Sequence, residues 1–398
     1  MKIIVLGAGV IGVATAWYLR QAGHEVRVLD RREGPGLETS FANGGQISAD
    51  HAAPWAKPGV PLQALKWLMH EDAPLLFRLR ADPRQWRWGL EFLRNCTAAR
   101  FRGNAARLRQ LGRYSRACLH RLQQETGLQF DRVRRGILVF HTEAVERGAD
   151  WKSPEQCVSI EPALAALGPK LLGGTYLPED ESGDAYKFTV GLASKCVESG
   201  VVFDRGIHIE NFRLEGQEIK GVRATNVQEA ISGDAYVLAL GSYSALLARR
   251  IGIDLPIYPL KGYSVTLPVK NPQAAWTVSL SDDAHKLVLS RLGERLRIAG
   301  TAELNGYNTD INELRCRAIV RRVTGLFPEA GDTSRAEFWT GLRPATPSNL
   351  PCIGRTRYPN LFLNTGHGTL GWTLACGSAR ALADLMSGRA PEVALSPP

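Results

Sequence analysis

The first residues of the chain, MKIIVLGAGVIG, constrain its fold more than any other stretch. The apolar run Lys2–Leu6 is typical of a buried strand, and a helix over about Gly12–Ala22 is expected after it. The segment Gly7–Gly12 between them is a G-x-G-x-x-G turn, and a second strand is expected at Glu25–Asp30. This order of strand, glycine turn, helix and strand predicts the βαβ start of an open α/β sheet.

The spacing inside this start predicts a dinucleotide site. Gly7 would form the tight turn, Gly9 would let a pyrophosphate approach the backbone, and Gly12 would let the helix pack closely on the strand. The helix N-terminus offers free N–H groups and a positive dipole end to the phosphates. Asp30 lies 18 residues after Gly12, near the position where an acidic residue binds a ribose hydroxyl. It disfavours NADP although Arg31 follows it, and leaves NAD or FAD. A glycine turn without a ligand is the alternative.

A second glycine-rich turn near the C-terminus favours FAD. The segment NTGHGTLGWT carries Gly366, Gly368 and Gly371 between an expected strand and a long helix. A second helix N-terminus far from the first can stabilise the negative charge of a reduced flavin. The alternative is that this glycine-rich turn serves only the packing of the chain and binds no ligand.

We expect two interleaved domains, because a chain of 398 residues exceeds the size up to which a single hydrophobic core grows with chain length. We expect an α/β protein in which a Rossmann-like FAD-binding domain alternates with a substrate domain of mostly antiparallel strands plus helices. The expected FAD-binding segments are residues 1–57, 185–257 and 340–398, and the substrate segments are 58–184 and 258–339, with a basic helical segment at 61–126.

Charge is concentrated in that basic segment. Residues 78–135 hold 15 arginines and four acidic residues, a net +11, whereas the whole chain carries +10. Trp55, Trp67, Trp86 and Trp88 lie before and within it. An anionic membrane surface bound through residues 55–135 fits this composition, and so does a solvated arginine-rich face. No RRM or KH signature accompanies it, so we expect no nucleic-acid partner.

Several patterns bear on location and chemistry. No apolar run reaches the length of a membrane span, no secretory leader is visible, and the seven cysteines form no CxxC pair. We therefore expect a cytoplasmic protein with reduced thiols. Histidine spacings typical of metal sites do not occur, so no metal is expected.

Long motifs carry a resemblance to a known family. GAGVIGVATAWYLRQAGHEV, DRREGPGLETSFANGGQIS, YPLKGYSVTLP, FWTGLRPATPS and LNTGHGTLGWTLACGSA are similar to the bacterial FAD-dependent D-amino acid dehydrogenases of the glycine oxidase and D-amino acid oxidase superfamily. The resemblance covers nearly the whole chain. It implies non-covalent FAD, conversion of D-amino acids to 2-oxo acids and ammonia, a quinone or other electron acceptor, and peripheral attachment to the inner membrane.

The same resemblance implies the cofactor-binding residues. These are Gly7, Ala8, Gly9, Val10, Ile11, Gly12, Asp30, Arg31, Thr39, Ser40, Asn43, Gly44, Gly45, Gln46, Ile47, Ile209, Gly241, Ser242, Gly366, His367, Gly368, Leu370, Gly371, Trp372 and Thr373. Ser40 and Asn43 are also common turn residues, and this alternative stays open. His367 would either raise the flavin potential or satisfy its own loop.

Amine dehydrogenation needs an anchor for the substrate carboxylate more than a dedicated general base. A bidentate guanidinium is the natural anchor, and the resemblance assigns this role to Arg343 in the turn-like GLRP stretch. Tyr263 and Tyr258 are candidates for a second carboxylate hydrogen bond, or are packing residues. Lys261 would lie near the flavin or in solvent. His51 stands where relatives commonly have an aromatic residue and would shift substrate preference if it lines the pocket.

Two other functions remain compatible with these motifs. One is an oxygen-using amine oxidase acting on glycine, sarcosine or cyclic imino acids. The other is a non-catalytic FAD-binding subunit of a larger complex. The segment Glu143–Glu161 and the C-terminal tail look shorter than in the family, which bears on a lid and on membrane attachment.

Overall fold

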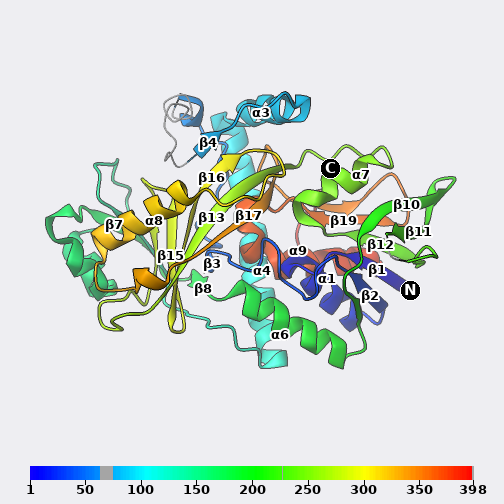
Figure 1. The fold of residues 1–398 in the computed structure, drawn as a ribbon, viewed down its shortest axis with the longest axis horizontal. Helices are drawn as coiled ribbons and strands as arrows, with labels where there is room; N and C mark the ends of the chain where they lie inside the picture. The colour runs from blue at the N-terminus through cyan, green and yellow to red at the C-terminus, as the bar shows by residue number, and fades with distance from the viewer. Residues whose placement is uncertain (63–74, 226, 397–398) are drawn as a thin grey trace.

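The computed structural model describes residues 1–62, 75–225 and 227–396. Trp67 and part of the predicted basic segment lie outside these residues. The described residues form two large sheets with helices packed around them (Figure 1). The predicted α/β fold class is confirmed.

The first sheet contains the βαβ start and has six strands in the order β18-β19-β12-β1-β2-β9. All neighbouring pairs are parallel except the edge pair β18–β19. The strands are β1 (Lys2–Leu6), β2 (Glu25–Leu29), β9 (Val202–Asp204), β12 (Ala235–Leu238), β18 (Cys352–Arg355) and β19 (Leu361–Thr365).

Both faces of this parallel sheet are covered, as its apolar strands require. Ile3 and Val5 of β1 point to the face that holds α1 (Val10–Gln21), α4 (Ala98–Thr126), α6 (Ala185–Glu198) and α9 (Gly371–Met386). Ile4 and Leu6 point to the other face, which holds α7 (Ser244–Arg249) and the hairpin of β10 (Ile209–Glu215) and β11 (Glu218–Ala224). The alternation of β1 thus places α1 and α9 on one side of the glycine turns.

The second sheet has nine strands and is mostly antiparallel. Its order is β17-β13-β16-β15-β14-β5-β7-β6, with β4 paired to β16. The pairs β14–β5 and β16–β4 are parallel. The strands are β4 (Leu75–Phe77), β5 (Ile137–His141), β6 (Trp151–Lys152), β7 (Gly173–Leu177), β13 (Tyr258–Pro268), β14 (Ser279–Asp282), β15 (Leu287–Leu292), β16 (Arg295–Leu304) and β17 (Glu337–Ala345).

Shorter elements surround this sheet. Helix α8 (Glu313–Leu326) and α5 (Pro154–Ile160) pack on one of its faces, and α3 (Pro83–Asn95) packs Trp88 beside Tyr258 on the other. Strands β3 (Gln46–Ile47) and β8 (Glu181–Ser182) pair with each other. Further 3₁₀ segments lie at Pro162–Lys170, which is kinked at Gly168, and at Gly241–Tyr243, Thr333–Arg335 and Gly368–Leu370. All seven cysteines are free thiols.

The structure differs in detail from two sequence predictions. The segment 61–126 is mostly helical where it is described, through α3 and α4, as expected, but the short strand β4 precedes these helices and joins the second sheet. The domain boundary expected at residue 340 falls inside β17, so that Arg343 lies on a strand and not on a turn. The rest of the domain division stays a prediction. Among the described helices, none combines the length and the apolarity needed to cross a bilayer.

Candidate active site

The glycine turn joins β1 to α1 so closely that side chains would not fit. Gly7 has a φ of 109°, a conformation that favours glycine, and a Cβ there would lie 2.6 Å from the Ala239 carbonyl oxygen. A Cβ at Gly12 would lie 1.8 Å from the Gly7 carbonyl oxygen. The hydroxyl of Ser40 accepts a 3.1 Å hydrogen bond from the backbone N–H of Val10 and so caps the start of α1.

Asp30 directly follows β2, beside this turn. Its carboxylate accepts hydrogen bonds from the backbone N–H groups of Ala8 at 2.7 Å and Arg32 at 2.8 Å. Burial raises the pKa of Asp30, although these two donors lower it in part. Arg31 lies over the ring of Tyr243 at 4.0 Å and also binds Glu38. The turn and its acidic residue therefore meet at one end of a cavity.

This first cavity has a volume of about 340 Å³ and runs from the glycine turn to Arg343. It brings together predicted cofactor residues from six separate segments of the chain. These are Gly7, Gly9, Val10, Ile11, Asp30, Arg31, Thr39, Ser40, Asn43, Gly44, Ile209, Gly241, Ser242, His367, Gly368, Gly371 and Trp372. Ala8, Gly12, Gly45, Gln46, Ile47, Gly366, Leu370 and Thr373 do not line it.

Several predicted cofactor residues use their side chains to build the walls. Thr39 and Ser242 each donate a hydrogen bond to the Leu342 carbonyl oxygen, at 2.9 and 3.0 Å. The Asn43 side chain accepts from the Gly45 N–H at 2.9 Å, which is the turn role left open for it. The Gln46 amide donates to Ser279, Leu280 and Ser281 in the second sheet. Gln46 thus points away from the first cavity.

His367 lies in the C-terminal turn and is 2% exposed. Its Nε2 is 3.0 Å from the Ser378 hydroxyl, and burial lowers its pKa to about 3. The imidazole is therefore neutral at ordinary pH and adds no positive charge to the cavity. Trp372 also lines the cavity, and its indole N–H donates to the Gly183 carbonyl oxygen.

Arg343 lies where the first cavity meets a second one of about 510 Å³. The guanidinium extends from β17 across Gly262 of β13, where a Cβ would lie 2.4 Å from Arg343 Cζ. Its Nη1 donates a 3.0 Å hydrogen bond to the Thr301 carbonyl oxygen of β16. Within the described residues it forms no ion pair, and burial lowers its pKa to about 10. It therefore stays a cation at neutral pH with most of its donors free.

The other predicted substrate residues divide between the two cavities and the core. His51 lines the second cavity with Arg343. Tyr263 borders the first cavity, but its hydroxyl donates its hydrogen bond to the Glu303 carboxylate. In this arrangement the hydroxyl cannot also donate a hydrogen bond to a ligand. The Tyr258 hydroxyl lies 3.4 Å from Asp82 and faces α3, away from both cavities. The two tyrosines therefore fit the packing alternative better than the carboxylate role.

A feature near Arg343 was missed from the sequence. Residues Lys261–Tyr263 of β13 lie opposite Gly300–Glu303 of β16, so β16 has one residue more and forms a bulge. Thr301 lies in this bulge with a φ of 50°, which a branched residue rarely adopts. Gly262 inside the strand YPLKGYSVTLP was the available signal, since an isolated glycine in a strand often marks a bulge or a close approach.

The residues present fit a bound dinucleotide. The cavity offers the turn at Gly9, the acidic Asp30 and the start of α9, each of which suits a different part of such a molecule. Asn364 Oδ1 is buried in the cavity wall and has no protein partner, which leaves an acceptor for a ligand hydroxyl. Fold and site together define a flavin-dependent oxidoreductase.

Comparison with known proteins agrees with this class. Residues 2–385 match the family described as FAD dependent oxidoreductase. A D-amino acid dehydrogenase of Dechloromonas aromatica is 52% identical over 98% of both chains. Another of Paramagnetospirillum magneticum is 51% identical over 99% of this chain and 97% of that protein. The chain belongs to the FAD dependent oxidoreductase family, and its cofactor is FAD.

Solved structures share the fold at low sequence identity. Glycine oxidase from Bacillus cereus matches with a TM-score of 0.73 and 20% identity, covering 97% of this chain and 95% of that one. L-proline dehydrogenase from P. horikoshii matches with a TM-score of 0.72 and 18% identity, covering 97% and 93%. At this level of identity the likeness shows a shared fold alone, and it does not indicate the substrate of this protein.

Proposed function

We propose that this protein is a D-amino acid dehydrogenase. It oxidises the Cα–N bond of a D-amino acid to an imino acid, which water converts to a 2-oxo acid and ammonia. The two electrons and the Cα hydrogen leave as a hydride, and the electrons pass on to a quinone or dye acceptor.

The observation that carries the proposal is the position of Arg343. Five of the described residues border the first and the second cavity at once, and Arg343 is the only charged residue among these five. A guanidinium with free donors and no carboxylate partner is suited to bind the carboxylate of a small acid through two parallel hydrogen bonds. In this proposal the acid lies in the second cavity, and its reacting carbon lies at the boundary with the first.

FAD, when bound, supplies the hydride acceptor for this chemistry. The chain's own residues then need only hold the substrate carboxylate, orient the Cα–H and exclude water. The proposal includes no general base, because a neutral amine can lose the hydride without one. The D configuration rests on the relatives, which are named D-amino acid dehydrogenase at 46–52% identity.

The proposal extends to a membrane surface as the place where the acceptor is met. Trp86, Leu90 and Leu93 of α3 are 53%, 58% and 50% exposed and follow the i, i+4, i+7 spacing of one helix face. Arg87 and Arg94 flank this stripe on the same helix. An apolar stripe bordered by arginines suits the interface of an anionic bilayer.

An anaerobic screen of the FAD-loaded protein tests the proposed reaction. D-, L- and cyclic amino acids are mixed with the protein in turn, and the visible flavin absorbance is followed. We expect D-amino acids to bleach the flavin, and a quinone or dye to restore the colour faster than oxygen does. Bleaching by L-amino acids alone, or by none of the compounds, would contradict the proposal. Fast restoration by oxygen would instead indicate an oxidase.

A further inference from the structure

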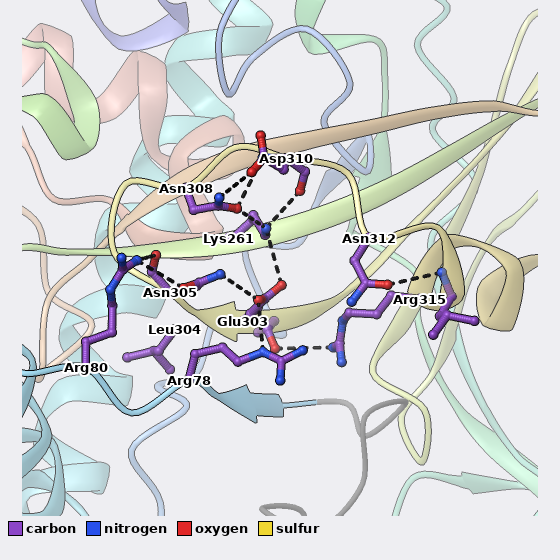
Figure 2. A network of polar contacts seen from close by, with 12 residues as sticks. Arg78, Arg80, Lys261, Glu303, Leu304, Asn305, Asn308, Asp310, Asn312 and Arg315 are labelled. Atoms are coloured by element: carbon purple, nitrogen blue, oxygen red, sulfur yellow. Dashed lines mark hydrogen bonds and ion pairs between the residues drawn. The ribbon is translucent and has the colours of Figure 1, made fainter.

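A buried polar network lies beneath the bulge, on the face of β13 and β16 away from the cavities. Lys261 and Glu303 lie at its centre (Figure 2). Each of them is 2% exposed. Lys261 Nζ lies 3.4 Å from Glu303 Oε2, 2.8 Å from Asn308 Oδ1 and 2.9 Å from the Asp310 carbonyl oxygen. The ammonium is therefore buried and not in solvent, one of the two places considered from the sequence, and Lys261 lines neither cavity.

The network stabilises the negative charge of Glu303. Burial alone would raise the pKa of Glu303, but the Tyr263 hydrogen bond and the Lys261 charge together bring that pKa below its usual value. Asn305 donates to the second carboxylate oxygen at 3.0 Å, and Arg78 approaches it at 3.6 Å. A buried ion pair with all these partners fixes geometry, since breaking it would leave an uncompensated charge.

On one side, the ion pair closes the bulge. Lys261 and Glu303 are register partners directly after the extra residue of β16. The bulge turns the Thr301 carbonyl out of the ladder and toward the guanidinium of Arg343, which it holds at 3.0 Å. A Lys261 that keeps Glu303 in register therefore keeps this carbonyl in place.

On the other side, the same ammonium holds the segment after β16. It binds Asn308 and Asp310, and between them Thr309 accepts a 2.8 Å hydrogen bond from the Thr340 hydroxyl. Tyr307 in this segment donates at 2.9 Å to the carbonyl oxygen of Ser242, which lines the first cavity. One side chain thus connects the Arg343 support to the wall of the FAD cavity.

We propose that Lys261 is a positioning residue for substrate binding. It touches neither cavity, and it acts by fixing the β16 bulge and the 305–310 segment, so that the guanidinium of Arg343 keeps its place relative to the FAD cavity. This role rests on the proposed carboxylate-binding function of Arg343. It replaces the flavin-directed role considered for this lysine from the sequence.

The test compares variants of the FAD-loaded protein. Lys261→Met removes the ammonium at similar volume, Lys261→Arg keeps a cation, and Lys261→Met/Glu303→Gln removes both charges and guards against misfolding. Glu161→Gln is the matched control, because Glu161 is 2% exposed, bonded by Thr277 and Val278, and absent from both cavities. Propionate, a carboxylate without an amine, is titrated while the flavin spectrum is followed.

We expect Lys261→Met and the double variant to raise the propionate Kd and the KM for D-alanine together, about tenfold, with the FAD Kd changed less than twofold. Lys261→Arg should stay within about threefold, and Glu161→Gln should lower the Tm without raising the propionate Kd. An unchanged propionate Kd in Lys261→Met and in the double variant would overturn the proposal. An equal rise of the propionate Kd in Glu161→Gln would overturn it as well. If propionate responds but no D-amino acid reduces the flavin, the positioning role stands and the proposed substrate fails.

Discussion

At the scale of single residues, what distinguishes Arg343 is its position between the two cavities with no opposite charge beside it. Several other arginines of the described chain meet carboxylates, as Arg116 does with Asp50 and Arg322 with Asp282. The sequence pointed to Arg343 through the GLRP motif, but it could not tell a strand from a turn there. The sequence also could not decide whether Tyr263 binds a ligand or packs in the core, because its hydrogen-bond partner Glu303 lies 40 residues away in the chain.

Arg343→Met removes the proposed carboxylate anchor while keeping an unbranched side chain of similar length up to the Nε position. We expect KM for D-alanine to rise about 100-fold, since charged hydrogen bonds of this kind contribute about 3 kcal/mol. FAD should stay bound. The KM of Arg343→Lys should lie between those of the parent protein and Arg343→Met, because a lysine cannot form the bidentate contact with a carboxylate. The measurement is steady-state kinetics with a dye acceptor, together with FAD content.

Arg297→Met serves as the control for this variant. Arg297 is also a buried arginine of the second sheet with its pKa lowered to about 10 by burial, and it lines neither cavity. It should lose stability with KM almost unchanged. A KM for Arg343→Met equal to that of the parent protein would exclude the anchor role.

At the scale of elements, predictions succeeded where one pattern decides the structure. The strand Lys2–Leu6 and the helix ending at Thr126 before Gly127 appear as expected, because a glycine turn and a left-handed C-cap leave few alternatives. β4 was missed because a three-residue strand carries too little periodicity, and the bulge was missed because it depends on register between strands far apart in the chain.

Helix α3 is expected to contact lipid through its exposed stripe. A Trp86→Ser/Leu90→Ser/Leu93→Ser variant should bind vesicles of phosphatidylglycerol and phosphatidylcholine several-fold more weakly than the parent protein, because its apolar face no longer enters the interface. Binding of the parent should weaken with salt and with pure phosphatidylcholine, since the arginines need anionic lipid. Cosedimentation with the vesicles measures both effects.

Leu314→Ser on α8 provides the matched control. Leu314 is 67% exposed, so the substitution also removes an exposed apolar side chain, but one outside the stripe. Equal loss of binding in the two variants, or no vesicle binding by the parent protein, would remove α3 from the proposal.

At the scale of the whole molecule, the FAD cavity joins the two sheets. Its wall includes Gly9 and Ala239 from the first sheet's turns, and Gly262 and Ala299 from strands of the second. The interleaved order of segments was predictable, because βα material returned in the middle and at the end of the chain. The boundary near residue 340 was not, since β17 continues as a strand of the second sheet through Ala345.

FAD is therefore expected to stabilise both sheets at once. At an FAD concentration 100 times its Kd, the free energy of unfolding should rise by about 2.7 kcal/mol. Calorimetry should give a single transition with FAD, and a lower Tm with a broader or split transition once FAD is removed. A split transition in which FAD raises only one component would show that the cofactor is held by one sheet alone.

The extra residue in β16 also has a genetic consequence. Loss of one codon at position 301 or 302 would remove the extra residue and restore a regular ladder with β13, in which Glu303 stays opposite Lys261. The carbonyl that the bulge turns toward Arg343 would then return to the ladder, so Arg343 would lose its support although the ion pair remains. Insertions and deletions in this strand should therefore be tolerated far less well than most single substitutions, and a strand exchanged between relatives must bring its own residue count with it.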